Sequence, residues 1–229
     1  MRPRDKLSLL LPVAYVCVRY LAARTLAGTP AAAAVGAGIG AVFLLASALL
    51  CPELSDEVRP ALNAPGPLTA ALTVMLAAAG YAAAVRLAVP AGDVLPPGPL
   101  AMADIWLLGP LAEEALYRGG LYRTLKRLAP TVPAALFSAA LFAAAHGSTL
   151  QALLAFPFGL LSVTVLELTG TLRASAALHC GYNLLTDILA CAGAAGTSLA
   201  AFSAGCCLLC VLLCLFRTSP FILIEKRTD

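Results

Sequence analysis

Long apolar segments, each about as long as a lipid bilayer is thick, constrain the fold of this chain more than any other feature of its sequence. A helix needs about 20 mainly apolar residues to cross the hydrocarbon core, where its backbone groups must be satisfied internally. The sequence predicts such helices at 7–27, 31–51, 68–89, 102–128, 132–148, 150–169, 172–193 and 195–216. We therefore expect an all-α fold, a polytopic membrane bundle of about eight transmembrane helices.

The composition supports one membrane domain. The 229 residues are 61% hydrophobic and only 12% charged, and no hydrophilic stretch is long enough to form a separate soluble domain. Residues 1–229 are therefore expected to form a single integral membrane domain that contacts membrane lipid. The net charge of +3 is explained by anchoring to anionic lipid, and without a soluble basic surface we expect no binding to nucleic acid.

The positions of the basic residues predict the orientation of the chain. With an even number of spans and both termini cytoplasmic, most Lys and Arg residues fall in cytoplasmic segments, as the positive-inside rule requires. These residues are Arg2, Arg4, Lys6, Arg59, Arg123, Lys126, Arg127, Arg173, Arg217, Lys226 and Arg227. We expect a multi-pass protein of the cell inner (plasma) membrane.

Several polar residues lie inside the predicted spans. Charged groups at bilayer depth cost several kcal/mol each, so they usually face a protein-lined cavity and have a function there. The residues concerned are Glu113, Glu114, Arg118, His146, His179 and Asn183. They come from three predicted helices surrounded by Ala, Leu and Phe, and we expect them to meet in an internal polar cavity.

Helical spacing gives these residues different tasks. Glu114 and Arg118 are four residues apart and can pair on one helix face. Glu113 points about 100° away from Glu114 and has no such partner, which suits a general base. His179 and Asn183 are also four apart, as are Phe142 and His146, so each pair can line one side of the cavity.

Two carboxylates and two imidazoles around a pocket favour hydrolysis of an amide bond. A glutamate can take a proton from water, one histidine can steer that water or protonate the leaving amine, and a histidine with an asparagine can stabilise an oxyanion. A Zn²⁺ ion bound by Glu113, His146 and His179 could instead activate the water. Both routes lead to the same reaction.

Three segments resemble motifs of the CPBP (CAAX protease and bacteriocin-processing) family of intramembrane proteases. "EEALYRG" at 113–119, "FAAAH" at 142–146 and "HCGYN" at 179–183 are similar to the family's EExxxRG, FxxxH and HxxxN motifs. The family includes the type II CAAX prenyl endopeptidases and bacterial proteins linked to bacteriocin self-immunity. The resemblance covers residues 103–193, which would form the catalytic core.

The resemblance implies a bundle of eight helices with a conical cavity open to the cytosol and the bilayer. Glu113, aided by His146, would activate the water, and Glu114 with Arg118 would shape the site. His179 and Asn183 would hold the oxyanion. Tyr117, which replaces a common Phe of the family, and Phe142 would line the substrate cavity. We favour a reaction without metal or other cofactor, with zinc as the alternative.

The sequence is compatible with more than one class of function, and it does not identify the substrate. The chain is expected to be an intramembrane endopeptidase that cuts a protein or peptide delivered within the membrane; a non-catalytic scaffold or immunity factor and a proton-coupled transporter are the alternatives. The Ala-, Leu- and Gly-rich composition favours a bacterial source and therefore argues against a prenylated substrate. His146 and Arg118 fall at different depths in straight helices, so the helix over 102–128 must be tilted or broken for the cluster to form.

Overall fold

The computed structural model describes residues 3–29, 31–50, 66–89 and 98–192, and these ranges are almost entirely helical. Three long helices come first: α1 (Pro3–Leu26), α2 (Ala31–Leu50) and α3 (Pro67–Ala88). An uninterrupted helix then runs through α4 (Pro99–Ala103), η2 (Asp104–Leu108), α5 (Gly109–Glu113), η3 (Glu114–Tyr122) and α6 (Arg123–Leu128). The described chain ends with α7 (Thr131–Ala144), α8 (Thr149–Thr169) and α9 (Leu172–Cys191).

The predicted all-α fold is confirmed for the described residues, which contain no strand. Seven of the eight predicted spans correspond to these helices, and the eighth, at 195–216, lies outside the described residues. Four of the described helices are long and apolar enough to cross a membrane: Asp5–Leu26, Ala31–Leu49, Leu68–Ala88 and Thr149–Thr169. The chain is thus a helical membrane protein.

One predicted span is shorter than expected. The sequence predicted a helix over 132–148, but α7 ends at Ala144 and His146 lies in the turn that follows. The turn forms because Ser148 caps the N-terminus of α8, its hydroxyl accepting a hydrogen bond from the Gln151 amide. His146 therefore stands at a helix junction and not within a span.

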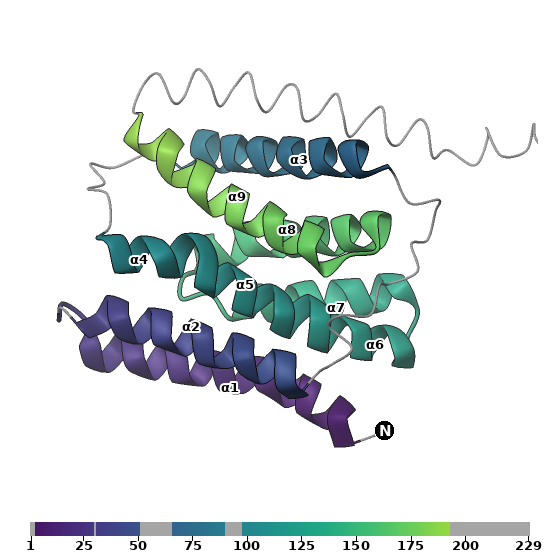
Figure 1. The fold of residues 1–229 in the computed structure, drawn as a ribbon, viewed down its shortest axis with the longest axis horizontal. Coiled ribbons are helices and arrows are strands. Elements are labelled where there is room, and N and C mark those ends of the chain that lie inside the picture. Colours follow the sequence, from purple (N-terminus) through teal and green to yellow (C-terminus); the bar gives the residue numbers. More distant parts are fainter. Residues whose placement is uncertain (1–2, 30, 51–65, 90–97, 193–229) are drawn as a thin grey trace, which may run out of the picture.

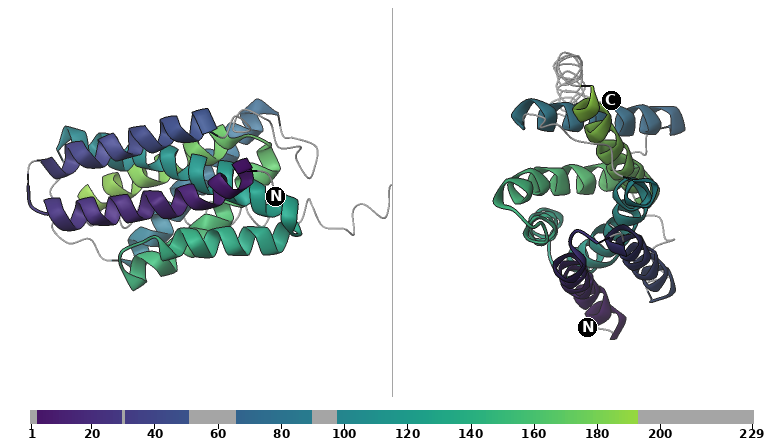
Figure 2. Two further views of the ribbon diagram at one scale, coloured as in Figure 1. Left: turned by 90° about the horizontal axis from the view of Figure 1, so that it is seen from below. Right: turned by 90° about the vertical axis from the view of Figure 1, so that its left-hand side faces the viewer.

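The helices pack as pairs around the central 99–128 helix. Figure 1 shows α1 and α2 side by side along one side of this helix, while α9 lies between it and α3. In the end-on view of Figure 2 (right), α7 and α8 form a second pair on another flank. Segments from both halves of the chain thus surround residues 104–122.

Small residues allow two of these helices to approach closely. A Cβ atom on Gly159 of α8 would lie only 3.0 Å from Cα of Ala139 in α7. In lipid the hydrophobic effect does not drive two helices together. The close packing that glycine permits favours their association instead. Next to this contact, a buried core containing Leu116, Phe142 and Phe158 joins the helix pair to the 99–128 helix.

Candidate active site

The 99–128 helix is irregular at the predicted site. Its segments η2 and η3 are π-helical, with backbone bonds reaching one residue further than in an α-helix, and short π-helical stretches are frequent at functional sites. Gly109 permits the first of them, since a Cβ there would lie 2.9 Å from the carbonyl oxygen of Asp104. The helix is therefore not broken, but its register changes twice near Glu113, over Asp104–Leu108 and again from Glu114 onwards.

Glu114 is fully buried and is surrounded by donors. His179 Nδ1 lies 2.9 Å from Oε1, and the Ser162 hydroxyl donates to Oε2 at 2.8 Å. The Ser175 hydroxyl also donates to Oε2, and Arg118 Nη1 lies 3.1 Å from Oε1. Both carboxylate oxygens therefore have hydrogen-bonding or charged partners, as a buried charge requires.

Arg118 is held on three sides. Besides its ion pair with Glu114, Nη2 donates to the carbonyl oxygen of Gly159 at 3.4 Å. The guanidinium carbon lies 4.3 Å from the centre of the Phe142 ring, a cation–π geometry. Only 1% of the Arg118 side chain is exposed. The pairing that was predicted from the i, i+4 spacing of Glu114 and Arg118 is present.

Glu113 has few contacts by comparison. Tyr15 donates to its Oε1 at 3.4 Å, and His179 Nε2 lies 3.9 Å from its Oε2. About 23% of the Glu113 side chain is exposed. His179 therefore stands between the two glutamates, with Nδ1 towards Glu114 and Nε2 towards Glu113, in a site open to a further molecule on the Glu113 side.

His146 is oriented by a backbone bond. Its Nδ1 lies 2.9 Å from the carbonyl oxygen of Phe142, which can only accept, so Nδ1 carries the hydrogen. In the neutral ring Nε2 then keeps its lone pair, which can accept a proton. The ring also packs edge-on against Phe142, with the centroids 4.9 Å apart.

Asn183 reaches across the cavity to the central helix. Its Nδ2 donates to the carbonyl oxygen of Ile105, at 2.8 Å. One hydrogen of the amide group is used in this bond, and the second hydrogen and Oδ1 remain available for other partners. Asn183 and His179 are one turn apart on α9, as the spacing predicted, and both side chains border the same cavity.

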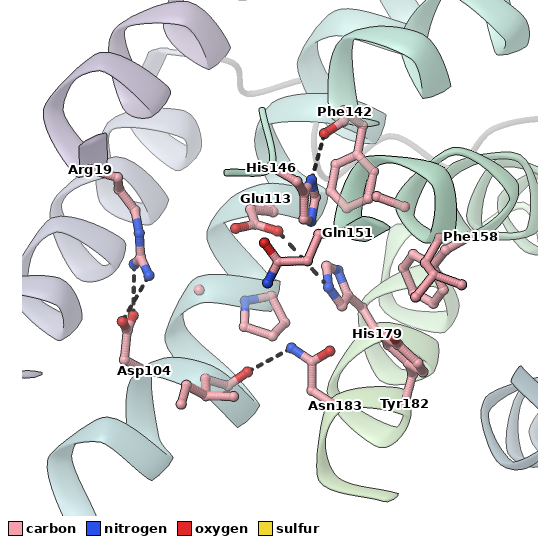
Figure 3. A pocket seen from close by; sticks show the side chains of 15 residues that line it. Arg19, Asp104, Glu113, Phe142, His146, Gln151, Phe158, His179, Tyr182 and Asn183 are labelled. Atoms are coloured by element: carbon pink, nitrogen blue, oxygen red, sulfur yellow. Dashed lines mark hydrogen bonds and ion pairs between the residues drawn. The ribbon is translucent and has the colours of Figure 1, made fainter. Parts of the chain in front are cut away.

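These side chains enclose a cavity of about 290 Å³, seen from close by in Figure 3. Glu113, His146, His179, Asn183 and Phe142 line it, as the sequence predicted. Glu114 contacts His179, but neither Glu114 nor Arg118 lines the cavity, and both are buried. Tyr117 is expected at the cavity but is only 2% exposed, and its ring packs edge-on against Phe142 instead of facing the cavity.

Sequence reasoning missed the contribution of α1. Arg19 and Asp104 line the cavity and form a two-pronged ion pair, with both N–O distances 2.9 Å. Tyr15, one turn before Arg19, reaches Glu113. The signal was available, because an arginine inside an apolar span needs a partner. Its partner, 85 positions away, is not marked by any local pattern.

The remaining polar residues have separate partners. Ser162 and Ser175, which no sequence pattern singled out, lie with their hydroxyl oxygens 2.7 Å apart beneath Glu114. Each hydroxyl has a single hydrogen, which it donates to the Glu114 carboxylate. Glu167 pairs with Lys126 at the other end of the central helix, and Asp187 accepts a hydrogen bond from the Trp106 indole. Gln151 also borders the cavity.

Metal binding at this site would require several acidic, histidine or cysteine side chains to converge on one point. Among the described residues, no group of three or more His, Cys, Asp or Glu side chains is arranged so that it could hold a metal ion. This includes Glu113, His146 and His179, the ligands expected for zinc. The side chains as placed therefore do not fit the zinc alternative.

Comparison with known proteins identifies the segment that carries this site. Residues 96–185 match the family model described as "Type II CAAX prenyl endopeptidase Rce1-like". Searches of curated proteins and of solved structures gave no match. The matched residues contain all three motifs and every predicted site residue. The segment that carries the site, residues 96–185, is therefore similar to the Rce1-like type II CAAX prenyl endopeptidases.

Proposed function

We propose that the protein is an intramembrane endopeptidase in which Glu113 activates a water molecule for attack on a peptide bond. The observation that carries this proposal is the position of Glu113, a carboxylate with few contacts that faces His179 across a cavity within the membrane bundle. A carboxylate in this position costs free energy to bury and contributes little to packing. A catalytic use accounts for its presence.

The reaction assigns one task to each side of the cavity. Glu113 removes a proton from water while the water oxygen bonds to the carbonyl carbon of the substrate. The carbonyl oxygen becomes an oxyanion that accepts hydrogen bonds from His179 and Asn183. Because Nδ1 of His179 is committed to Glu114, its donor to the oxyanion must be Nε2, which then has to carry a hydrogen.

The second half of the reaction breaks the peptide bond. The tetrahedral intermediate collapses, the C–N bond breaks, and the proton taken from water passes to the leaving amine. His146 guides the water through Nε2, since Nδ1 is held by the Phe142 carbonyl. Glu114 and Arg118 do not contact the substrate, and they position His179 from behind. No metal takes part in the proposed reaction.

The proposal extends to topology. Residues 195–216 would form an eighth span and complete one integral membrane domain over 1–229, with the catalytic core at 103–193. Both termini would face the cytoplasm of a bacterial inner membrane, with lipid around the bundle. The substrate would be a protein or peptide that enters the cavity from the membrane, and the apolar side chains Phe142, Leu154 and Phe158, which also line the cavity, suit an apolar segment.

The decisive experiment compares membrane peptidomes of cells that carry the wild type or Glu113→Gln. We expect peptides that accumulate only with the wild type, because the amide of Gln cannot take the proton from water. Equal peptidomes at equal protein levels would overturn the protease proposal and favour a scaffold or immunity factor. Proton-coupled uptake lost in Glu113→Gln without any peptide difference would favour a transporter.

Metal dependence is tested separately on the purified protein. A peptide found in the comparison serves as substrate, and it is incubated with the enzyme before and after treatment with a strong zinc chelator. We expect the cleavage rate to stay unchanged. A loss that added Zn²⁺ reverses would replace the metal-free reaction by zinc-assisted hydrolysis.

A further inference from the structure

The π-helical turn η2 leaves one backbone carbonyl without a helical donor. The amide of Gly109 bonds to the carbonyl oxygen of Asp104, five residues back, which is the π-helical register. In the same register Ile105 would receive the amide of residue 110. That residue is Pro110, which has no N–H. The Ile105 carbonyl therefore needs a donor from elsewhere.

Asn183 supplies this donor. Its side-chain Nδ2 lies 2.8 Å from the Ile105 oxygen, a normal length for this type of hydrogen bond. Figure 3 shows the bond crossing the lower side of the cavity from α9 to the central helix. We propose that Asn183 is a positioning residue: its amide replaces the missing Pro110 donor and fixes the π-helical turn from which the chain continues to Glu113. The inference rests on the proposed function in its assumption that Glu113 is the base.

Other contacts show that the turn is held on both sides. One turn further along α9, Asp187 accepts a hydrogen bond from the Trp106 indole at 2.7 Å. On the opposite side, Arg19 of α1 holds Asp104. Gly36 leaves room for this pair, since a Cβ there would lie 2.7 Å from an Asp104 oxygen. Each of three successive residues, 104 to 106, is thus tied to a neighbouring helix.

The position of the turn matters for the reaction because Glu113 follows Ile105 by only eight residues. An α-helical register at this point would rotate and shift everything that follows relative to His179. Misplacement of a reacting group by about 1 Å can cost about 10²-fold in rate. The bond uses one amide hydrogen only, so Asn183 can still donate its second hydrogen to an oxyanion.

A double-mutant cycle tests whether the Asn183 side chain replaces the backbone amide donor that Pro110 lacks. The variants are Asn183→Ala, Pro110→Ala and their combination; Pro110→Ala returns an N–H to position 110. Pro157→Ala, alone and combined with Asn183→Ala, is the matched control, since Pro157 is an exposed proline inside α8. All are purified in detergent as the full chain, and Tm and processing of a peptide from the peptidome comparison are measured.

We expect Asn183→Ala to lower Tm by about 2–4 °C, the shift that corresponds to loss of one hydrogen bond of about 1 kcal/mol. Adding Pro110→Ala should restore most of this loss and raise processing above that of Asn183→Ala alone. Adding Pro157→Ala should do neither. Any processing deficit left in the Asn183→Ala, Pro110→Ala variant measures the direct contact of the amide with substrate.

Two outcomes would overturn the inference. If the effects of Asn183→Ala and Pro110→Ala simply add in Tm, the Pro110 donor is not what Asn183 replaces. If Tm recovers but processing does not rise, the bond stabilises the fold without positioning Glu113. Failure of the proposed function itself is recognised independently, because the membrane peptidomes of wild type and Glu113→Gln would then be equal, whatever the Tm cycle shows.

Discussion

Glu113 and Glu114 are adjacent in the chain, but they belong to two different regions of the site. The closed hub, which we define as Glu114, Arg118, Ser162 and Ser175, is buried, and the two oxygens of its carboxylate receive an ion pair and three hydrogen bonds. The cavity wall, defined as Glu113, His146, His179 and Asn183, borders about 290 Å³ of open volume. His179 touches both regions.

The difference shows how a protein can keep two carboxylates next to each other within a membrane. The charge of Glu114 is balanced by a fixed cation and by hydroxyl donors, so this carboxylate has a structural role. Glu113 has no Lys or Arg partner among the described residues and receives only a long hydrogen bond from Tyr15, so its carboxylate remains available to a reactant. The comparison predicts different results for substitutions in the two regions: in the cavity wall activity is lost while Tm falls by at most about 4 °C, whereas in the closed hub the fold itself is strongly weakened.

The largest effect on activity is expected for Glu113→Gln. Removal of a general base costs about 10²–10⁴-fold in rate, and the amide has nearly the same shape as the carboxylate. We expect the variant to insert normally and to keep its Tm within about 2 °C, since it alters only two long contacts of the described residues, the 3.4 Å hydrogen bond from Tyr15 and the 3.9 Å approach of His179 Nε2. The amount of product peptide per mole of membrane protein provides the measurement. A large fall in Tm would show that Glu113 is structural after all.

Arg118→Met should have the largest effect on stability. It leaves Glu114 buried without its cation, and breaking a buried pair costs about 3–5 kcal/mol. We expect little folded protein after detergent extraction, measured by size-exclusion chromatography. The control is Arg118→Met combined with Glu114→Gln, which removes both charges and should recover much of the folded fraction. No recovery would mean that packing of Arg118 on Phe142, and not charge pairing, dominates.

Ser175→Ala tests the hub more gently. It removes one of the donors to Glu114, and the expected cost is about 1–3 kcal/mol for a buried hydrogen bond to a charged group. The measurement is thermal unfolding in detergent. Ser138→Ala is a suitable control, because that buried hydroxyl donates to the backbone oxygen of Tyr117 and not to a charged group. Equal losses in the two variants would argue against a special role of the hub.

Much of the hub and cavity wall could be predicted from the sequence. Polar residues inside apolar spans identified Glu113, Glu114, His146 and His179, and the i, i+4 rule correctly paired Glu114 with Arg118. Apolar length predicted where the described helices lie, although α7 ends at Ala144 and not at residue 148. The family resemblance placed Tyr117 at the cavity, but its ring is buried against Phe142, because a motif cannot tell which neighbour will cover an aromatic ring.

Contacts between distant segments could not be predicted. Nothing in the sequence distinguishes Ser162 and Ser175 from other serines, since the hydroxyl of a serine inside a membrane helix can donate to a backbone carbonyl of its own helix. The π-helical register could not be predicted either. It depends on Asp104, Pro110 and Asn183 together, and these residues are brought together only by the packing of α9 on the central helix. The contribution of α1 was missed for the same reason.

The smallest effect is expected where α1 meets the cavity wall. Tyr15→Phe removes the hydroxyl that donates to Glu113 at 3.4 Å, a long bond whose loss should cost less than about 1 kcal/mol. Processing should therefore change by less than about fivefold, while Tm stays close to that of the wild type because the buried ring is retained. Tyr20→Phe, on the exposed side of the same helix, serves as control and should change neither. A loss as large as that of Glu113→Gln would place the Tyr15 hydroxyl among the groups that act on the substrate, and the cavity wall would then have to include α1.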